Sequence, residues 1–367
     1  MGKDFQNRNI KSQKFLNAAI FLTAGIGDAV LMVPLLKELK SSGYLITIFL
    51  NSPYIDKEFL EFNRFPYNEI KILTYPLNLT NILRNYKKYN LILLDYSSSS
   101  VKNIFLASLI SKKVNAHSKK KLPFFNVHYL DENENTHCAI LNLQLLDSKK
   151  NDMSFSLDQI NIKPYFENTP DCIRKIKNEG KKPIIVQPVS ANNIVKYKNW
   201  SHYNWIDFLR KLSKEYPEFH FILIGDKNEI TIGNEINNEI EVNITNMIGK
   251  TSLKEACSIL YHSQFYIGLD SGFMHLAVAY GIPTFSIFGA SSVEFVGYEK
   301  FDNLIHKVIY NPLYCWPCHG FSQTNKSKVT NPKNCEDISC IRGISVDNAY
   351  NNFVEYIKIL KILTLMR

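Results

Sequence analysis

The sequence predicts an α/β protein with two domains, each built on a parallel sheet covered by helices. Short apolar segments alternate with amphipathic helical segments along most of the chain, which is the pattern of strand–helix–strand units. The alternation stops in a polar stretch between residues 148 and 178 that holds two prolines, and then starts again. At 367 residues the chain is also longer than one hydrophobic core usually supports.

Composition excludes several classes of protein. A hydrophobic content of 45% is too high for a disordered chain. The net charge of +9 favours an anionic ligand or surface, but no nucleic-acid module is recognisable, so nucleic acid is not an expected partner. Seven cysteines are too few, and odd in number, for a secreted disulfide framework. We therefore expect a cytoplasmic protein.

The apolar stretch over residues 15–36 needs a separate interpretation, because it resembles a signal peptide or a membrane span. Gly25, Gly27, Asp28 and Pro34 interrupt its middle, which lipid would tolerate poorly. The stretch then continues into an amphipathic helical pattern, unlike a cleaved leader. It predicts the first strand, turn and helix of a domain.

The first half is expected to form one domain over residues 1–165. Residues 1–13 are expected to form a loose arm, and the pattern becomes irregular between residues 111 and 130. Apolar runs and helical periodicity predict the remaining elements. The expected strands are 15–22, 44–50, 70–73 and 91–95, and the expected helices are 29–40, 56–62, 79–88 and 136–146.

The second half is expected to form a second domain over residues 166–345, followed by a C-terminal helix over 346–367. Its pattern repeats that of the first half, which predicts a second parallel sheet. The expected strands are 183–187, 219–224, 265–268 and 284–288, and the expected helices are 205–216, 253–261, 273–280 and 346–365.

The stretch around Asp270-Ser271-Gly272 is the most informative part of the chain. It follows a buried strand and precedes an apolar helix that ends at Gly281. Unpaired N–H groups at the start of such a helix form an anion site, suited to a phosphate or diphosphate. The alternative is an ordinary crossover in which Asp270 only caps the helix.

Three further polar residues follow predicted strands, where α/β sheets bind ligands. Asp28 follows Gly25-Ile26-Gly27, which is not a dinucleotide fingerprint because residue 30 is Val. It is either a helix cap or a general base. Lys198 is either a surface lysine or a group that neutralises a leaving phosphate. Glu229 could accept hydrogen bonds from a ribose or a base.

Four cysteines near the C-terminus have the spacing of a metal site. Cys315-x2-Cys318 and Cys335-x4-Cys340 flank a polar loop, as in a structural tetrathiolate centre. Zinc is the default ion for these ligands, and iron is compatible with them. Four reduced thiols without a metal are the alternative.

The chain resembles the heptosyltransferase family, glycosyltransferase family 9. Three motifs carry the resemblance: Gly25-x-Gly27-Asp28 with Pro34, Asn246-x-x-Gly249-Lys250-Thr251-Ser252-Leu253, and the stretch from Asp270 to Gly289. The similarity extends over about residues 15–347 and is weaker between residues 50 and 175. The cysteine pattern is similar to that of the autotransporter branch, whose members modify proteins, bind iron and form large oligomers.

The resemblance implies a GT-B fold, in which two Rossmann-like domains face each other across a cleft. It implies that residues 1–165 form the acceptor domain and that residues 166–345, which include the cysteine cluster, form the nucleotide-sugar domain. It implies that Asp28 is the general base and that Lys198 supports the departing diphosphate. No metal or cofactor is needed for the chemistry. The residues implied to bind the donor are Gly27, Glu229, Asp270, Ser271, Gly272, Phe273, Met274 and His275. For His275 a purely structural role is almost equally compatible with the sequence.

The implied reaction is inverting transfer of heptose from ADP-heptose, or of a sugar from another nucleotide, to a hydroxyl group. The implied acceptor is a sugar of a lipopolysaccharide core. The alternative acceptor is a Ser or Thr of a surface protein such as an autotransporter. A nucleotide-sugar-binding protein without catalysis is the third hypothesis. Peripheral contact with the inner face of the inner membrane is also compatible with the basic charge.

Overall fold

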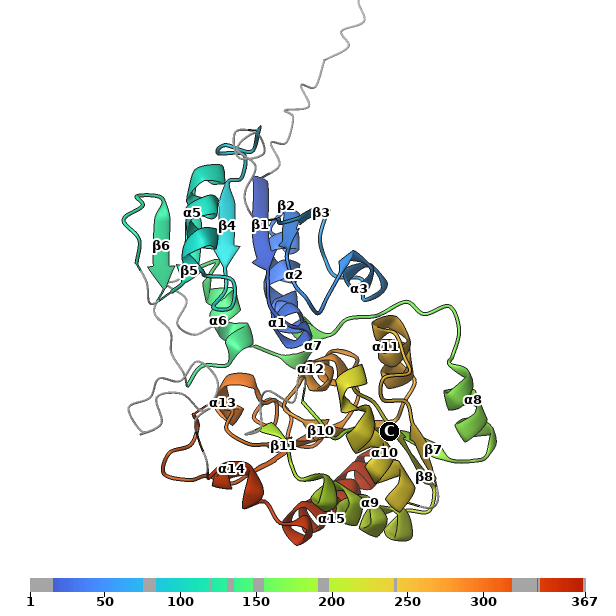
Figure 1. The fold of residues 1–367 in the computed structure, drawn as a ribbon. Coiled ribbons are helices and arrows are strands. Elements are labelled where there is room, and N and C mark those ends of the chain that lie inside the picture. The colour runs from blue at the N-terminus through green and yellow to red at the C-terminus, as the bar shows by residue number, and fades with distance from the viewer. Residues whose placement is uncertain are drawn as a thin grey trace, which may run out of the picture.

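The computed structural model describes most of the chain, with short gaps. The described residues are 16–74, 84–118, 121–130, 135–147, 155–190, 198–240, 243–318, 335 and 337–365. The predicted N-terminal arm and half of the predicted helix over 79–88 lie outside them. Two sheets form the frame of two domains, one above the other in Figure 1.

The first sheet has six parallel strands in the order β3-β2-β1-β4-β5-β6. The two inner strands carry the most apolar sequences, and β1 is buried from Ala18 to Leu22, as expected for a sheet covered on both faces. The strands are β1 (Leu16–Leu22), β2 (Tyr44–Leu50), β3 (Glu69–Ile72), β4 (Leu91–Leu94), β5 (Val114–His117) and β6 (Val127–Leu130).

The second sheet repeats the topology of the first. Its order is β12-β11-β10-β7-β8-β9. When the six strands of each domain are numbered along the chain and the second sheet is read from β9, both sheets have the order 3-2-1-4-5-6. This is the doubly wound Rossmann order, whose ligand site lies where the first and fourth strands separate. The strands are β7 (Lys182–Gln187), β8 (Phe219–Leu223), β9 (Ile244–Asn246), β10 (Phe265–Leu269), β11 (Thr284–Phe288) and β12 (His306–Tyr310).

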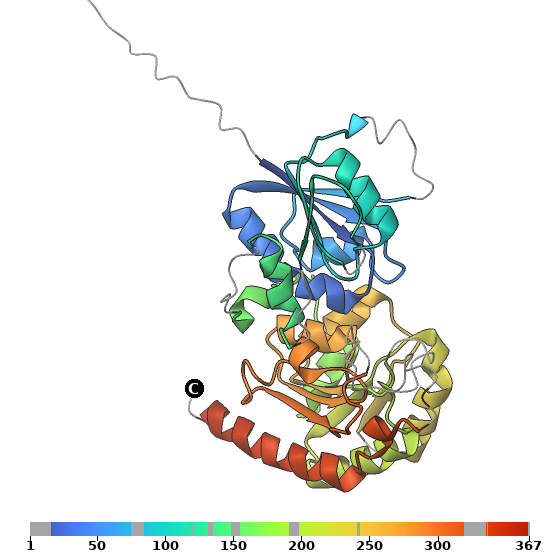
Figure 2. The same ribbon diagram turned by 90° about the vertical axis from the view of Figure 1, so that its left-hand side faces the viewer.

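Helices connect the strands of both sheets, and α15 runs along the base of the second domain (Figure 2). In the first domain they are α1 (Ile26–Leu31), α2 (Val33–Ser41), α3 (Lys57–Phe62), α5 (Val101–Ile110) and α6 (Cys138–Gln144). Between the sheets and in the second domain they are α7 (Leu157–Ile160), α8 (Asp171–Asn178), α9 (His202–Glu215), the 3-10 turn η2 (Lys227–Glu229), α10 (Ile230–Glu239), α11 (Leu253–Tyr261), α12 (Gly272–Ala279), α13 (Val293–Val296), α14 (Ser339–Arg342) and α15 (Val346–Leu365).

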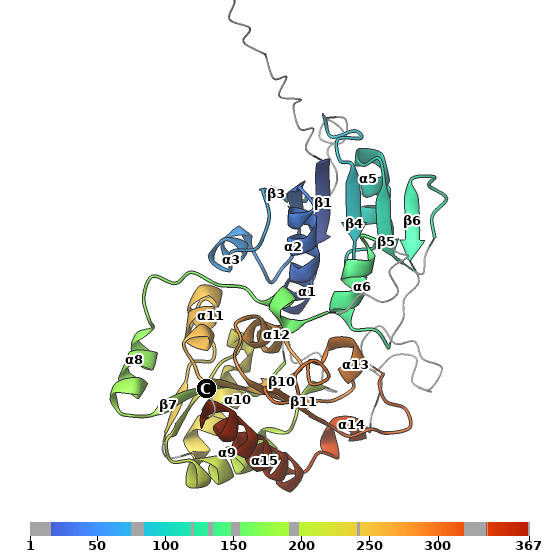
Figure 3. The same ribbon diagram turned by 180° about the vertical axis from the view of Figure 1, so that it is seen from behind.

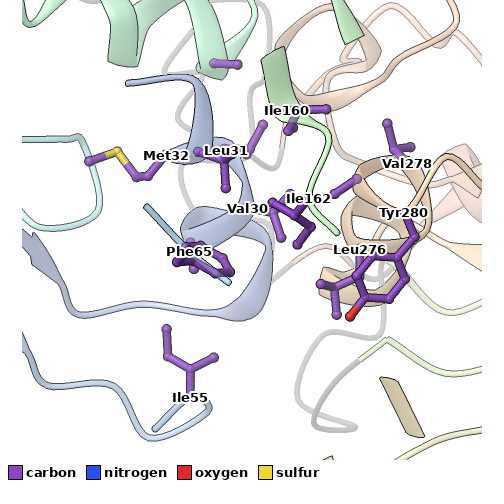
Figure 4. Packing of buried hydrophobic residues seen from close by; sticks show 14 of the residues in the cluster. Val30, Leu31, Met32, Ile55, Phe65, Ile160, Ile162, Leu276, Val278 and Tyr280 are labelled. Carbon is purple, nitrogen blue, oxygen red and sulfur yellow. The ribbon is translucent and has the colours of Figure 1, made fainter. Parts of the chain in front are cut away.

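A continuous apolar core joins the two domains. Figure 4 shows residues of α1 facing residues of α12, with Ile160 and Ile162 beside them. The Ile162 amide donates to the Ala279 carbonyl at 2.8 Å. Figure 3 shows α11 below α3, where Lys254 pairs with Glu58 at 3.1 Å. The domains therefore pack directly on each other.

The structure corrects three expectations. The helix predicted over 29–40 starts at Ile26 and is broken at Met32, because Pro34 has no N–H to continue the hydrogen-bond ladder. The irregular stretch over 111–130 contains β5 and β6, and it follows α5, which the sequence reading did not anticipate. The expected linker contains α8.

Two further observations concern the domain boundary and the search for membrane-spanning helices. The domain boundary near residue 165 stays a prediction. It falls between β6, the last strand of the first sheet along the chain, and β7, the first strand of the second sheet. Among the described helices, none has both the length and the apolar character that a membrane span requires.

Candidate functional site

The predicted site residues lie at the points where the first and fourth strands of each sheet separate. Asp28 follows β1 and Asp270 follows β10, while Lys198 belongs to the connection after β7. The helices that follow β1 and β10 meet at the domain junction. A Cβ atom on Gly27 would lie 2.7 Å from Cδ2 of His275, and one on Gly272 would lie 2.8 Å from Cβ of Ile26. Glycine at both positions therefore allows the two helices to approach this closely.

Asp28 lies in the first turn of α1 and is partly buried. Its Oδ2 accepts a hydrogen bond from the Gly25 amide at 3.0 Å, so the capping role is real. Burial and the negative charge of Asp95 raise the pKa of Asp28 from 3.8 to about 6, against the lowering effects of the Gly25 amide and of Lys198. A carboxylate with this pKa can both accept and hold a proton near neutral pH. The capping role and the base role are therefore compatible.

Asp95 is a charged residue of this site that the sequence reading did not assign. It follows β4, and the pairing of Ile20 with Leu93 places it beside the carboxyl end of β1. It is 3% exposed and accepts hydrogen bonds from Ser97 Oγ at 2.7 Å and from the Ser98 amide at 2.9 Å. Its position directly after the fourth strand is the feature of the sequence that could have identified it.

Lys198 and Asp270 form a buried ion pair. Lys198 Nζ lies 2.6 Å from Asp270 Oδ2, and the two side chains are 17% and 7% exposed. Ser291 Oγ donates to the same carboxylate oxygen. Burial alone would raise the pKa of Asp270, but the Lys198 ammonium outweighs it and lowers that pKa to about 2. Asp270 is therefore ionised at every working pH.

Adjacent residues hold Lys198 in this place. The Ser190 amide donates to Asn199 Oδ1 at 2.9 Å, and the Trp200 indole donates to the Ile344 carbonyl at 2.8 Å. Ser190 Oγ in turn donates to the Asp270 carbonyl at 3.1 Å. The surface-lysine alternative is wrong, because Lys198 is mostly buried and paired.

The N-terminus of α12 presents free amide groups. Ser271 caps the helix and its hydroxyl accepts from the Met274 amide at 3.4 Å. Gln187 Oε1 holds the Ser271 hydroxyl at 2.5 Å and the Tyr266 hydroxyl at 2.9 Å. Within the described residues, no group accepts from the amides of Gly272 and Phe273, and both residues are partly exposed. Two donors at a helix N-terminus suit an anion.

His275 connects the two domains. Its Nδ1 forms a 2.7 Å hydrogen bond with the Tyr298 hydroxyl, and the other edge of its ring lies against Gly27. Burial lowers the pKa of His275 to about 4, so the imidazole is neutral at neutral pH. His275 therefore has the structural role that the sequence left open, and it lies at the edge of the site. Tyr298, which the sequence reading missed, is 1% exposed.

Glu229 lies after β8 and is only 1% exposed. Its Oε2 accepts from the Asp226 amide at 2.9 Å. Its Oε1 is buried without a hydrogen-bond partner among the described residues. Burial raises the pKa of Glu229 from 4.5 to about 7. An unpaired buried carboxylate oxygen is costly, and a ligand hydroxyl would satisfy it.

The four C-terminal cysteines gather on one side of the second domain. Burial and the charges of the other three thiols raise the pKa of Cys318 to about 12, and burial and neighbouring thiols raise that of Cys340 to about 11. All four thiols are free. Nevertheless, no three His, Cys, Asp or Glu in the described part of the chain are placed to hold a metal ion.

The cysteine segment also touches the loop that supports Asp270. The Cys318 amide donates to the Ala290 carbonyl at 2.9 Å, and the Trp316 indole donates to the Gly289 carbonyl at 2.9 Å. The next residue, Ser291, is the one bonded to Asp270. The structure thus brings Asp28, Lys198, Asp270 and the start of α12 together at the domain junction, with the cysteine segment beside the loop after β11. Glu229 lies elsewhere in the second domain, after β8.

Comparison with known proteins agrees with this architecture. The sequence profile of glycosyltransferase family 9 (heptosyltransferase) matches residues 87–328. The chain is 24% identical to lipooligosaccharide heptosyltransferase 2 of Campylobacter jejuni over 307 residues, which are 82% of this chain and 88% of that protein. It is 30% identical to lipopolysaccharide heptosyltransferase 2 of Salmonella typhimurium, but over 27% of this chain and 29% of that protein only.

Solved structures share the fold. The Escherichia coli ADP-heptose lipopolysaccharide heptosyltransferase II superposes with a TM-score of 0.67 at 17% identity, over 94% of this chain and 99% of that one. The iron-containing dodecameric glycosyltransferase TibC from enterotoxigenic E. coli superposes with a TM-score of 0.57 at 15% identity, over 94% and 79%. Since the profile matches well over half of the chain, the protein belongs to glycosyltransferase family 9, the heptosyltransferases, and has the GT-B fold.

Proposed function

We propose that the protein transfers a heptose from ADP-heptose to a hydroxyl group of a lipo-oligosaccharide core, with inversion at the anomeric carbon. The observation that carries the proposal is the meeting of two opposed sites at the domain junction. One contributes Asp28, whose pKa is raised to about 6. The other contributes Lys198, Asp270 and the free amides of α12. The relatives named for heptosyl transfer to lipopolysaccharide support this choice of substrates.

The reaction follows from this arrangement. Asp28 takes the proton of the acceptor hydroxyl, and the oxygen attacks the anomeric carbon from the face opposite the diphosphate. The bond from that carbon to the diphosphate oxygen breaks, and its electron pair leaves with ADP. The amides of Gly272 and Phe273 and the ammonium of Lys198 stabilise the negative charge that develops. No cofactor takes part.

The donor is held by residues of both sites. Glu229 accepts a hydrogen bond from the nucleoside through its unpaired Oε1, and Asp270 accepts hydrogen bonds from the sugar. Gly27 and His275 lie at the edge of the proposed donor site, where the His275 ring packs against Gly27. The diphosphate lies at the start of α12, lined by Ser271, Gly272, Phe273, Met274 and His275.

A thermal-shift panel of ADP-, UDP-, GDP- and CMP-linked sugars tests the donor class. Selective stabilisation by ADP sugars supports the proposal, because a ligand stabilises the folded state that binds it. Incubation of the stabilising sugar with a heptose-deficient core acceptor then tests transfer. Binding without transfer to any acceptor would favour the hypothesis of a nucleotide-sugar-binding protein.

A protein acceptor is the second candidate. It is favoured by the gathered cysteines and by the structural similarity to iron-containing TibC. Incubation with purified surface proteins, followed by mass spectrometry of their Ser and Thr residues, distinguishes it. A mass increase of one heptose on the protein, with no transfer to the core acceptor, would replace the first proposal.

We also propose a structural zinc or iron ion held by Cys315, Cys318, Cys335 and Cys340. Four thiols in mutual electrostatic range suit either ion, and a cation would relieve the repulsion that raises the pKa of Cys318 and Cys340. The thiols would have to move to surround one ion, because no three such ligands in the described part of the chain are placed to hold it. Elemental analysis of the purified protein should give one equivalent of metal, and four titratable thiols without metal would exclude the site.

The proposed substrates also fix where the enzyme works. Nucleotide sugars and unfinished core acceptors meet at the inner face of the inner membrane, so we place the protein in the cytoplasm with peripheral membrane contact. Cell fractionation should recover it in the cytoplasm and, in part, with inner membranes. Recovery from the periplasm would exclude this placement.

A further inference from the structure

One face of the N-terminal domain exposes apolar side chains in a regular pattern. On α5, Val101 is 45% exposed and Phe105 is 46% exposed, and Leu109 continues the same stripe four residues further on. The Phe105 ring lies 5.9 Å from that of Phe124, and Phe125 is fully exposed. This stripe is therefore not covered by the rest of the described chain.

Two flanking segments bring further exposed groups to the end of α5. Lys87 Nζ donates to the Ser108 carbonyl at 2.8 Å, and Asn126 Nδ2 donates to the same carbonyl at 2.9 Å. These bonds place Tyr86, which is 62% exposed, and Phe125 next to residues that contact the C-terminal end of the helix. Figure 2 shows α5 at the surface of its domain. The α5 face is defined by Tyr86, Lys88, Val101, Lys102, Phe105, Lys112, Lys113, Lys121 and Phe125, all of them exposed.

This face also concentrates the positive charge of the protein. Between residues 84 and 130 the sequence has nine Lys and Arg residues and one acidic residue, Asp95. Asp95 is 3% exposed and belongs to the candidate active site. The whole chain has a net charge of +9, so this segment alone accounts for nearly all of it. Exposed apolar groups amid lysines, with no exposed carboxylate between residues 84 and 130, define a strongly polarised surface.

We propose that the α5 face binds the surface of an anionic phospholipid bilayer. Phe105, Phe125 and Tyr86 would enter the interfacial layer, where amphipathic and aromatic side chains are stabilised. The lysines would bind lipid phosphates, and each basic residue near such a surface adds to the attraction. A second copy of the same face is the less favoured occupant, because its lysines would repel those of the first copy.

The position of the face gives the binding a purpose that rests on the proposed function. Helix α5 starts directly after the loop from Asp95 to Ser100, and this loop lies beside Asp28 at the carboxyl edge of the first sheet. A bilayer bound at α5 would therefore keep this domain at the surface that carries a lipid-linked acceptor. Binding itself requires no acceptor.

Co-sedimentation with vesicles tests the proposal on the full chain. We expect binding to vesicles that contain phosphatidylglycerol, weaker binding at high salt, and little binding to phosphatidylcholine alone. The double variant Lys112→Glu/Lys113→Glu should lose at least about tenfold in affinity. Phe125→Ser should also weaken binding, and its fully exposed position leaves folding undisturbed. Tyr203→Ser is the matched control, since Tyr203 is 69% exposed on α9 of the other domain.

The outcomes separate this inference from the proposed function. Equal binding by wild type and both variants, or equal binding to both lipids, would overturn it. A dimer in light scattering that Phe125→Ser dissociates, without vesicle binding, would assign the face to a second copy and also overturn it. Turnover of a short, water-soluble acceptor should be unchanged in the variants. Vesicle binding by a protein that transfers no heptose would leave the inference standing and reject the proposed function.

Discussion

The two sheets share one topology, yet the sites at their strand ends carry opposite electrostatics. Where β1 and β4 separate, two carboxylates lie within electrostatic range of each other, and the pKa of Asp28 is raised to about 6 by burial and by Asp95. Where β7 and β10 separate, a lysine faces a carboxylate, and the pKa of Asp270 is lowered to about 2 despite its burial. The fold decides where each carboxylate lies, and the neighbouring charge decides whether it titrates near neutral pH.

This difference matches the two tasks that an inverting transfer needs. A base works best when its pKa is close to the working pH, and Asp28 has such a pKa. A group that only binds and orients a sugar must keep its charge, and Asp270 does so through Lys198. The following experiments test this division, beginning with the largest expected effect.

Asp28→Ala should remove the base and lower kcat by about 10²- to 10⁴-fold. Binding of the nucleotide sugar, measured by thermal shift, should persist because the donor site lies mainly on the second domain. Asp28→Asn is the matched variant, since its amide oxygen can still accept from the Gly25 amide. Turnover close to wild type in both variants would reject Asp28 as the base.

Lys198→Ala should lower kcat by about 10²- to 10³-fold, comparable to the loss of one group that stabilises charge in a transition state. The change also leaves the buried Asp270 carboxylate without its cation, so its pKa should rise. Lys198→Arg should recover part of the activity because it restores the charge. If Lys198→Ala changes KM for the donor but leaves kcat intact, Lys198 binds the ground state only.

The pH profile should show an acid limb of kcat/KM near pH 6, because only ionised Asp28 accepts the acceptor proton. As the pH falls through this pKa, the base becomes protonated and the rate falls. Asp95→Asn removes the neighbouring negative charge and should move the limb to lower pH. Above the limb, its kcat should fall by no more than about threefold, since a weaker base is a slightly poorer catalyst.

The position of this acid limb in the Asp95→Asn variant tests whether Asp95 and Asp28 interact. Asp95→Asn keeps an oxygen that can accept from the Ser98 amide, so the loop should stay in place. An unmoved acid limb in this variant would mean that the two carboxylates do not interact.

Tyr298→Phe should have the smallest effect on activity and a measurable effect on stability. It removes the hydroxyl bonded to His275 Nδ1 and leaves a buried ring nitrogen unpaired. The expected loss is about 1–3 kcal/mol in the free energy of unfolding, measured by urea denaturation. The exposed Tyr203→Phe is the control, and an equal loss in that variant would exclude the His275 contact as the cause.

Much of the fold was predictable because strands and helices of this chain carry clear periodicity. Strand β2 and helices α11 and α15 agree with the predicted ranges. Strands β5 and β6 were missed because each has four residues with polar or aromatic members, too short for a pattern. Asp95 and Tyr298 were missed because their roles depend on partners distant in sequence.

By itself the sequence determined the class of fold, the order of strand ends and the identity of the residues placed there, because apolar periodicity, glycine and proline act locally. Only the tertiary structure decided that Lys198 pairs with Asp270 and that the charge of Asp95 acts on Asp28. The tertiary structure alone also left the α5 stripe uncovered. These features depend on distances between residues far apart in the chain, and electrostatic energies follow those distances and the burial of each charge.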